Sequence, residues 1–374
     1  MTGLGLSEAQ TGLLFSLTLV GDTLVSLILT ITADRVGRRR TLVAGALLMA
    51  AAGIAFISTR NFLFLLIAGT IGVISPSGNE VGPFLPIEQA ALAHVIPGRS
   101  RTAAFAWYTL IGSFATAAGS LCGGMLPGAL QAGTVAPSQS YRAVVILYAC
   151  IGILLAAIFS RLSPATEAFA ESSSHAKAFG IGPSRAVILK LSGLFALDAF
   201  GGGFVVQSLA AYWFYLRFGV RPAALGAIFF GANVFAGISA LLAARLAARF
   251  GLVRTMVFTH LPSNVLLILV PLMPTQALAI TVLLLRFSIS QMDVPTRQSY
   301  VMAVVRPEER SAAAGVTGVA RTIGASVAPW LVGLMFARTS LINLPFFLAG
   351  TLKIVYDLLL YREFVSLPPP EETS

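Results

Sequence analysis

The chain has 374 residues, of which 56% are apolar and only 11% are charged, and its mean hydropathy is +0.85. A soluble domain has about 25% charged residues, so this composition excludes a soluble enzyme and a disordered chain. The net charge of +10 would favour a nucleic-acid partner in a soluble protein, but here it reflects the preference of Lys and Arg for cytoplasmic loops, and we expect no such partner.

Apolar segments of about 20 residues, the length that crosses a bilayer, recur along the whole sequence. They predict an all-α, polytopic membrane protein. In chain order, the eleven expected spans are 10–33, 41–59, 62–93, 102–126, 141–161, 186–214, 223–247, 255–273, 276–304, 311–337 and 343–361.

The first span is followed by residues 33–40 (ADRVGRRR), where Gly37 permits a tight turn. This segment resembles the loop motif of the major facilitator superfamily between its second and third helices. The motif is matched by Asp34, Arg35, Gly37, Arg38 and Arg39. The resemblance implies that the acid and the arginines form a gate latch to the other half of the protein.

The resemblance covers the whole chain and implies two pseudo-symmetric helical bundles. The superfamily has twelve helices, and the visible spans correspond to helices 2 to 12, so the sequence apparently lacks the first. Either the start site is placed too far downstream, or the protein has eleven spans. An internal repeat agrees with two halves: a shift of 209 residues aligns Pro86 with Pro295 and Arg101 with Arg310. A shift of 214 aligns Gly37 with Gly251 and Arg40 with Arg254.

The third span carries an acid in the segment 76–86 (PSGNEVGPFLP). Its prolines and glycines predict a broken helix, which is tolerated at membrane depth only where protein or a water-filled cavity satisfies the backbone. We therefore predict that Asn79 and Glu80 contribute to a solute or proton site. The alternative is a kink with Glu80 paired internally.

In the fourth span, residues 119–124 (GSLCGG) resemble the antiporter signature of the family, although glycine-rich stretches also serve close helix packing.

The polar segment 162–185 predicts a linker between the bundles. The expected organisation is an N-terminal bundle (1–161), this linker, a C-terminal bundle (186–362) and a tail (363–374). Of the 25 Lys and Arg, fifteen fall in connections on the side of the linker and five on the other side. This bias predicts a multi-pass protein of the cell (inner or plasma) membrane with a cytoplasmic C-terminus.

The second half carries further ionisable residues inside its spans, where each costs about 2.5–3.5 kcal/mol near the centre if it faces lipid. Asp198 precedes three glycines that predict a hinge, and Gln207 follows on the same span. Asp293 and Arg297 are four residues apart and can pair on one helix face. The resemblance places Glu80, Asp198 and Asp293 on helices 4, 7 and 10, which line the central cavity of the family.

Three other assignments favour structure over function. Lys353 and Asp357 share the same four-residue spacing and are interpreted as a structural pair. His260 is alone on an apolar span and is interpreted as a packed core residue, with a proton relay as the alternative. Glu88 aligns with Arg297 in the repeat, which suggests a bridge across the bundles.

These observations predict a secondary active transporter that moves a small solute by alternating access. We expect proton coupling through a buried carboxylate, and efflux by antiport is one option. The alternative is a non-transporting membrane receptor or scaffold with the same fold. We expect no enzyme activity, no cofactor and no metal, and a monomer in the lipid bilayer. The substrate and the direction of transport stay open.

Overall fold

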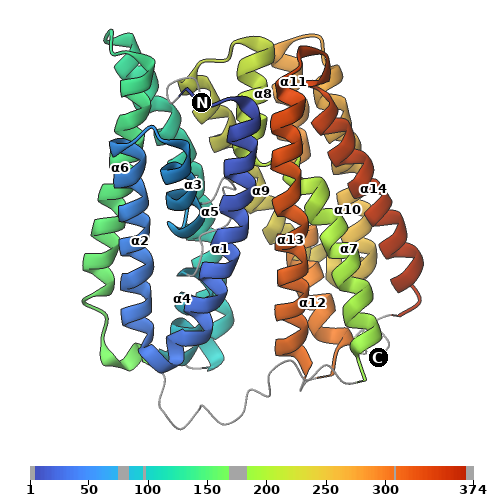
Figure 1. Ribbon diagram of the computed structural model, residues 1–374. Helices are drawn as coiled ribbons and strands as arrows, with labels where there is room; N and C mark the ends of the chain where they lie inside the picture. Colours follow the sequence, from blue (N-terminus) through green and yellow to red (C-terminus); the bar gives the residue numbers. More distant parts are fainter. Residues whose placement is uncertain (1–4, 75–83, 96–97, 168–182, 307–308, 368–374) are drawn as a thin grey trace.

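Every regular element in the described part of the chain is a helix (Figure 1). The computed structural model describes residues 5–74, 84–95, 98–167, 183–306 and 309–367, and leaves out some side chains within helices, among them those of Asp34 and Arg35. The predicted all-α membrane fold is confirmed.

The helices before the linker begin and end where capping residues, glycine and proline dictate. The side chain of Ser7 accepts a hydrogen bond from the backbone of Gln10 at the start of the first helix, and Asn61 caps the third in the same way. The helices of this group are α1 (Glu8–Val36), α2 (Arg38–Ser58), α3 (Phe62–Ile71), α4 (Phe84–Val95), α5 (Gly98–Ala132) and α6 (Pro137–Phe159).

The helices after the linker form a second group, which lies beside the first in Figure 1. They are α7 (Arg185–Gly203), α8 (Gln207–Phe218), α9 (Pro222–Phe250), α10 (Leu252–Leu269), α11 (Gln276–Phe287), α12 (Asp293–Val304), α13 (Arg310–Phe336) and α14 (Leu344–Phe364). The N-terminus and the C-terminus lie at opposite ends of the molecule, as an odd number of crossings requires.

Nine helical segments of the described chain are long and apolar enough to cross a membrane. In the described residues, the other two predicted spans, 62–93 and 276–304, each contain two short helices. The expected break of the first lies largely in residues 75–83, outside the described residues. In the second, the interruption at 288–292 places Asp293 in the first turn of α12, where the helix dipole favours a negative charge.

The predicted hinge at Gly201–Gly203 coincides with an interruption, since α7 ends at Gly203 and α8 begins at Gln207. The last of these glycines is also needed for packing. A Cβ atom on Gly203 would lie 2.8 Å from the Cβ of Ala328 on α13. The end of α7 therefore packs closely against α13 at the point where the helix is interrupted.

Two matching turns support the internal repeat. Gly37, between α1 and α2, has φ of +108°, and Gly251, between α9 and α10, has φ of +84°. L-residues with a side chain rarely adopt these angles, so glycine is required at both positions. The two glycines are the pair that the shift of 214 residues aligns.

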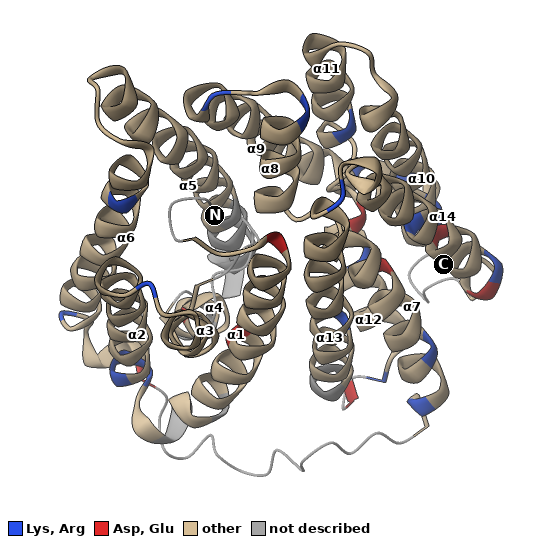
Figure 2. Ribbon diagram, turned by 45° about the horizontal axis from the view of Figure 1, so that its top comes forward, with Lys and Arg blue, Asp and Glu red and all other residues tan. Residues whose placement is uncertain are grey.

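The side walls of the molecule are suited to lipid. Charged residues gather mostly at the helix ends and leave most helix flanks without charge (Figure 2). Large apolar side chains such as Ile28, Phe64 and Trp107 are exposed on these flanks. In water such a surface would aggregate, whereas in a bilayer it faces acyl chains.

The two groups of helices meet through α1 with α13 and through α5 with α9. A Cβ atom on Gly12 would lie 2.9 Å from the Cα of Gly333, and one on Gly124 would lie 2.6 Å from the Cα of Gly226. These close approaches lie near the starts of α1 and α9 and in the later parts of α5 and α13. The ribbons of α1 and α13 diverge toward the end of α1 and the start of α13 (Figure 1).

Candidate functional site

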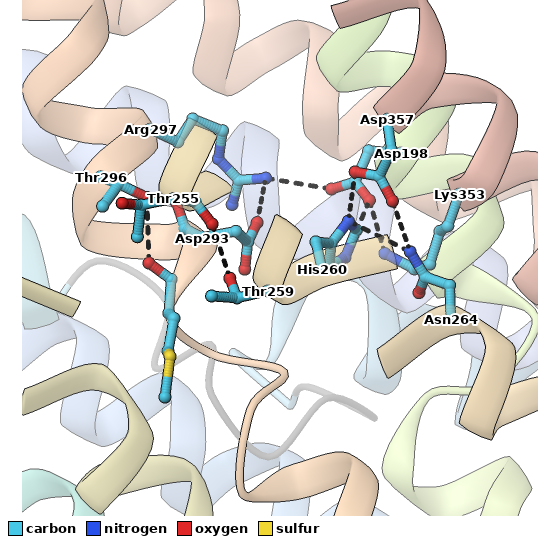
Figure 3. Close-up of polar contacts among 11 residues, drawn as sticks. Asp198, Thr255, Thr259, His260, Asn264, Asp293, Thr296, Arg297, Lys353 and Asp357 are labelled. Atoms are coloured by element: carbon cyan, nitrogen blue, oxygen red, sulfur yellow. Dashed lines mark hydrogen bonds and ion pairs between the residues drawn. The ribbon is translucent and has the colours of Figure 1, made fainter. Parts of the chain in front are cut away.

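Asp198 on α7 is the centre of a buried ionic network. Its Oδ1 accepts a hydrogen bond from Nζ of Lys353 on α14 at 2.5 Å, and its Oδ2 accepts one from Nη1 of Arg297 on α12 at 3.0 Å. All three residues are less than 9% exposed. One carboxylate therefore holds two cations from different helices in a place where an unpaired charge would be costly (Figure 3).

Arg297 also pairs with Asp293, at 3.1 Å between Nη1 and Oδ2, as the four-residue spacing predicts. In Figure 3 its guanidinium lies between Asp293 and Asp198. The proposed bridge from Glu88 to Arg297 is absent in this conformation, because Glu88 instead accepts a hydrogen bond from the hydroxyl of Tyr108 on α5. The partners described for Arg297 belong to its own bundle.

Two interpretations of single residues prove wrong. Lys353 does not pair with Asp357 but with Asp198, because it projects from α14 toward α7. His260 is not an isolated core residue. Its Nδ1 lies 2.8 Å from Oδ1 of Asp357, and its Nε2 lies 3.8 Å from Oδ1 of Asp198. Asn264 donates a second hydrogen bond to Asp357, at 2.9 Å. The network thus continues from α7 through α10 to α14.

A cavity of about 420 Å³ lies against this network. Its volume is in the range of sites for small ligands. Asp198 and Lys353 form part of its wall, so the ionic network is in contact with the space that a solute would occupy. The other polar or charged residues of the wall come from α8, α9, α11 and α13 and from the segment before α12: Gln207, Asn233, Arg286, Gln291, Arg321 and Thr322.

Gln207 connects the cavity wall to the first bundle. Its Nε2 donates to Oγ of Ser120 on α5 at 3.1 Å, and Nδ2 of Asn233 donates to the same oxygen at 3.1 Å. Nδ2 of Asn233 also donates to Oε1 of Gln207, at 3.2 Å. Two cavity residues of the second bundle therefore share one hydroxyl of the first bundle.

Asn79 and Glu80, the predicted site residues of the first half of the chain, lie outside the described residues, so their placement stays a prediction. Asp198, Asp293 and Arg297 come together as described above, whereas Gln207 lies on the cavity wall in a separate group of contacts.

The predicted gating segment contains the α1–α2 turn. The backbone N–H of Arg38 donates to Oε2 of Glu167 at 2.7 Å, and that of Arg39 donates to Oε1 at 3.2 Å. Nη1 of Arg38 donates to the carbonyl of Thr166 at 3.2 Å. The carboxylate thus caps the N-terminus of α2, where the helix dipole favours a negative charge. The side chains of Asp34 and Arg35 lie outside the described set, and their latch role stays a prediction.

Replacing Glu167 by alanine is expected to lower the free energy of unfolding by about 1 kcal/mol, because two N–H groups of α2 lose their acceptor. Thermal unfolding of the purified protein measures the loss. Glu363→Ala is the matched control, since Glu363 pairs with Lys190 on the exposed surface and caps no helix start. An equal effect of both changes would contradict the capping role.

The fold and the site define a polytopic membrane protein in which two helical groups meet beside a cavity with a buried ionic network. A family model of the Major Facilitator Superfamily matches residues 1–329. The chain belongs to this superfamily, as its sequence motifs predict.

Relatives and solved structures agree with this assignment. The chain is 30% identical to the Uncharacterized membrane protein YJR124C of Saccharomyces cerevisiae, over 98% of this chain and 89% of that protein. The xylose transporter XylE from E. coli, in an inward open conformation, shares 14% identity with a TM-score of 0.74, over 99% of this chain and 89% of that one. A bacterial homolog of the human lysosomal transporter Spinster, in an inward-facing and occupied conformation, shares 17% identity with a TM-score of 0.69, over 97% and 91%. These likenesses show the transporter fold.

Sequence reasoning missed four members of the network and its cavity: His260, Asn264, Lys353 and Arg321. One signal was present, because polar and ionisable side chains inside apolar spans are candidates for function by default. What was lacking was the direction in which each side chain points around its helix.

Proposed function

We propose that the protein is a secondary active transporter that moves a small solute by alternating access and couples this movement to protons. The observation that carries the proposal is the position of Asp198, which holds cations from two other helices and forms part of the wall of the cavity. A change in the charge of this residue would therefore alter the contacts among α7, α12 and α14.

The physical basis for coupling is the cost of a buried unpaired charge. Asp198 faces Lys353 from α14, Arg297 from α12, His260 from α10 and Arg321 from α13. Protonation would remove the negative charge of the carboxylate and so weaken its ion pairs with Lys353 and Arg297. These cations would then need other partners, and a rearrangement of the helices or a bound solute would provide them.

The movement itself would exchange the contacts between the bundles. In this conformation the two groups meet through the glycine contacts and through Ser120. We propose that bundles 1–161 and 186–362, joined by the linker 162–185, rock so that these contacts open while residues 33–40 close the opposite side. We further propose that the linker side is cytoplasmic, in the cell membrane, and that the protein acts as a monomer.

The test is transport in vesicles reconstituted with the purified protein. A pH gradient imposed across the vesicle membrane is expected to drive uptake or efflux of a solute. Conversely, a gradient of the solute is expected to drive protons across the membrane, which a pH-sensitive dye trapped in the vesicles reports. A protonophore serves as the control, because it collapses the gradient without touching the protein. Solute movement that is indifferent to the gradient and the protonophore would refute proton coupling, and no movement of any solute tested would favour a receptor or scaffold.

A further inference from the structure

The wall of the cavity carries more positive than negative charge. Its ionisable residues are Asp198, Lys353, Arg286 and Arg321, which are one acid and three bases. The acid is already engaged, because it accepts hydrogen bonds from Lys353 and from Arg297. Among the described residues, neither of the other two arginines has a hydrogen bond or ion pair with this carboxylate.

The charged residues next to the cavity wall do not remove the excess of positive charge. Arg297 adds one positive charge, and Asp293 and Asp357 add two negative ones. Together with the wall this makes four cationic side chains and three carboxylates, with His260 left out of the count. Among these seven side chains, one further negative charge would bring the balance to zero, and burial makes such a balance favourable.

Arg286 has unused hydrogen-bonding capacity at the cavity. It lies in the last turn of α11, and its Nε is buried with no hydrogen-bond partner among the described residues. Its guanidinium carbon lies 5.0 Å from the centre of the Phe287 ring, within the range of a cation–π contact. A buried donor without a partner is costly, and a ligand that accepts its hydrogen bond would remove that cost.

The other residues of the cavity wall suit the uncharged part of an organic solute. Phe229, Phe287 and Phe346 provide apolar surface, while Asn233 and Gln291 provide neutral amides. A cationic solute would need a carboxylate that is not already paired. The described acids of the network are all engaged, with Lys353, Arg297, Asn264 or His260 as partners.

We propose that the cavity binds a small organic anion, with Arg286 and Arg321 as the side chains that hold its negative group. Guanidinium groups bind carboxylates and phosphates through paired, charge-assisted hydrogen bonds, which makes two arginines from α11 and α13 a fitting pair of ligands. This inference rests on the proposed transport function and names the class of solute.

The first test needs only the wild-type protein. Benzoate, benzylamine and benzyl alcohol have nearly the same shape and differ in charge, and their binding to the purified protein is measured by calorimetry and by the shift of the unfolding temperature. Benzoate is expected to bind at least tenfold more tightly than the other two. Phenyl phosphate is added to separate carboxylate from phosphate, and preference for either anion supports the proposal. Tighter binding of benzylamine or of benzyl alcohol would overturn it.

The second test uses variants. Arg286→Gln and Arg321→Gln are each expected to weaken anion binding by roughly ten- to a hundredfold, because a charge-assisted hydrogen bond is lost. Arg245→Gln is the matched control, since Arg245 is exposed on α9 and is absent from the cavity wall. Arg321→Lys keeps the charge and is expected to lose less than Arg321→Gln. Anion binding that is unchanged in both glutamine variants would overturn the assignment.

Failure of this inference is distinct from failure of the proposed function. Vesicles that transport benzylamine or benzyl alcohol but not the anions would support transport and refute the anion site. Protein that binds the anions with the expected loss in Arg286→Gln, in vesicles that move none of them, would support the anion site and refute transport.

Discussion

Replacing Asp198 by asparagine is expected to destabilise the protein by about 3–5 kcal/mol and to abolish transport. The change leaves Lys353 without its acidic partner and Arg297 with only Asp293. A buried cation that loses its partner carries its full desolvation cost, which is the source of the stability loss. Thermal or denaturant unfolding in detergent measures the first effect, and flux into vesicles measures the second.

A double-mutant cycle separates the pair from its surroundings. Lys353→Met alone is expected to destabilise as well, because Asp198 then keeps only Arg297 as a hydrogen-bonded cation. The variant with both changes removes one charge of each sign, so its stability is expected to recover most of the loss. Its transport is expected to stay lost, since Asp198 can no longer exchange a proton.

The control for this cycle is the pair of Lys190 and Glu363, at 2.7 Å, whose side chains are 63% and 41% exposed. Exposed pairs contribute little, so Lys190→Gln with Glu363→Gln is expected to show no measurable coupling. If the buried pair also showed none, the network would be a set of independent contacts. If Asp198→Asn kept its transport and its proton movement, Asp198 would not be the coupling group.

The parts of the fold that depend on local sequence were predictable. Span positions follow from runs of apolar residues, the pairing of Asp293 with Arg297 follows from four-residue spacing on one helix, and the turn at Gly37 follows from its backbone freedom. Each of these depends on residues that are close in the chain. Local patterns were therefore sufficient for the class of fold and for one ion pair.

The contacts that build the site were not predictable in the same way. Lys353 is 155 residues from Asp198, and Asp357 is 97 residues from His260. Hydropathy gives the depth of each side chain in the membrane but not its direction around the helix axis, and adjacent residues differ by about 100°. The four-residue spacing of Lys353 and Asp357 suggested a pair on one helix, whereas tertiary contacts turned each toward another helix.

The glycines between the bundles are a second example of contacts that the sequence alone did not predict. The segment 119–124 was open to two interpretations, an antiporter signature or close packing. In the structure only one glycine of this segment makes a close approach: a Cβ on Gly124 would lie 2.6 Å from the Cα of Gly226, whereas one on Gly119 or Gly123 would meet nothing within 4 Å. Within this segment, the close approach of α5 to α9 thus falls on a single glycine, which the repeated glycines did not single out.

Replacing Gly124 by alanine is expected to shift the protein away from this conformation while the bundles stay folded. The added methyl group would meet the backbone of Gly226, which cannot rotate away, and overpacking of this kind costs about 1–3 kcal/mol. Because the contact joins the two bundles, the cost falls on the state in which they touch here, and the population of that state should fall by roughly 5- to 150-fold relative to others. Spin labels at Ala136 and Ser340 on one end are expected to move apart.

Labels at the opposite end, on Arg39 and Arg249, are expected to approach each other in the same variant, as alternating access requires. The matched controls are Gly119→Ala and Gly123→Ala, which add the same methyl group in the same segment where no neighbour lies within 4 Å. Cys122 and Cys150 are free and exposed, so both are replaced before labelling. If Gly124→Ala left all label distances unchanged, the contact would not hold the bundles together. If all three glycine variants shifted them equally, the effect would come from the flexibility of α5 and not from its packing on α9.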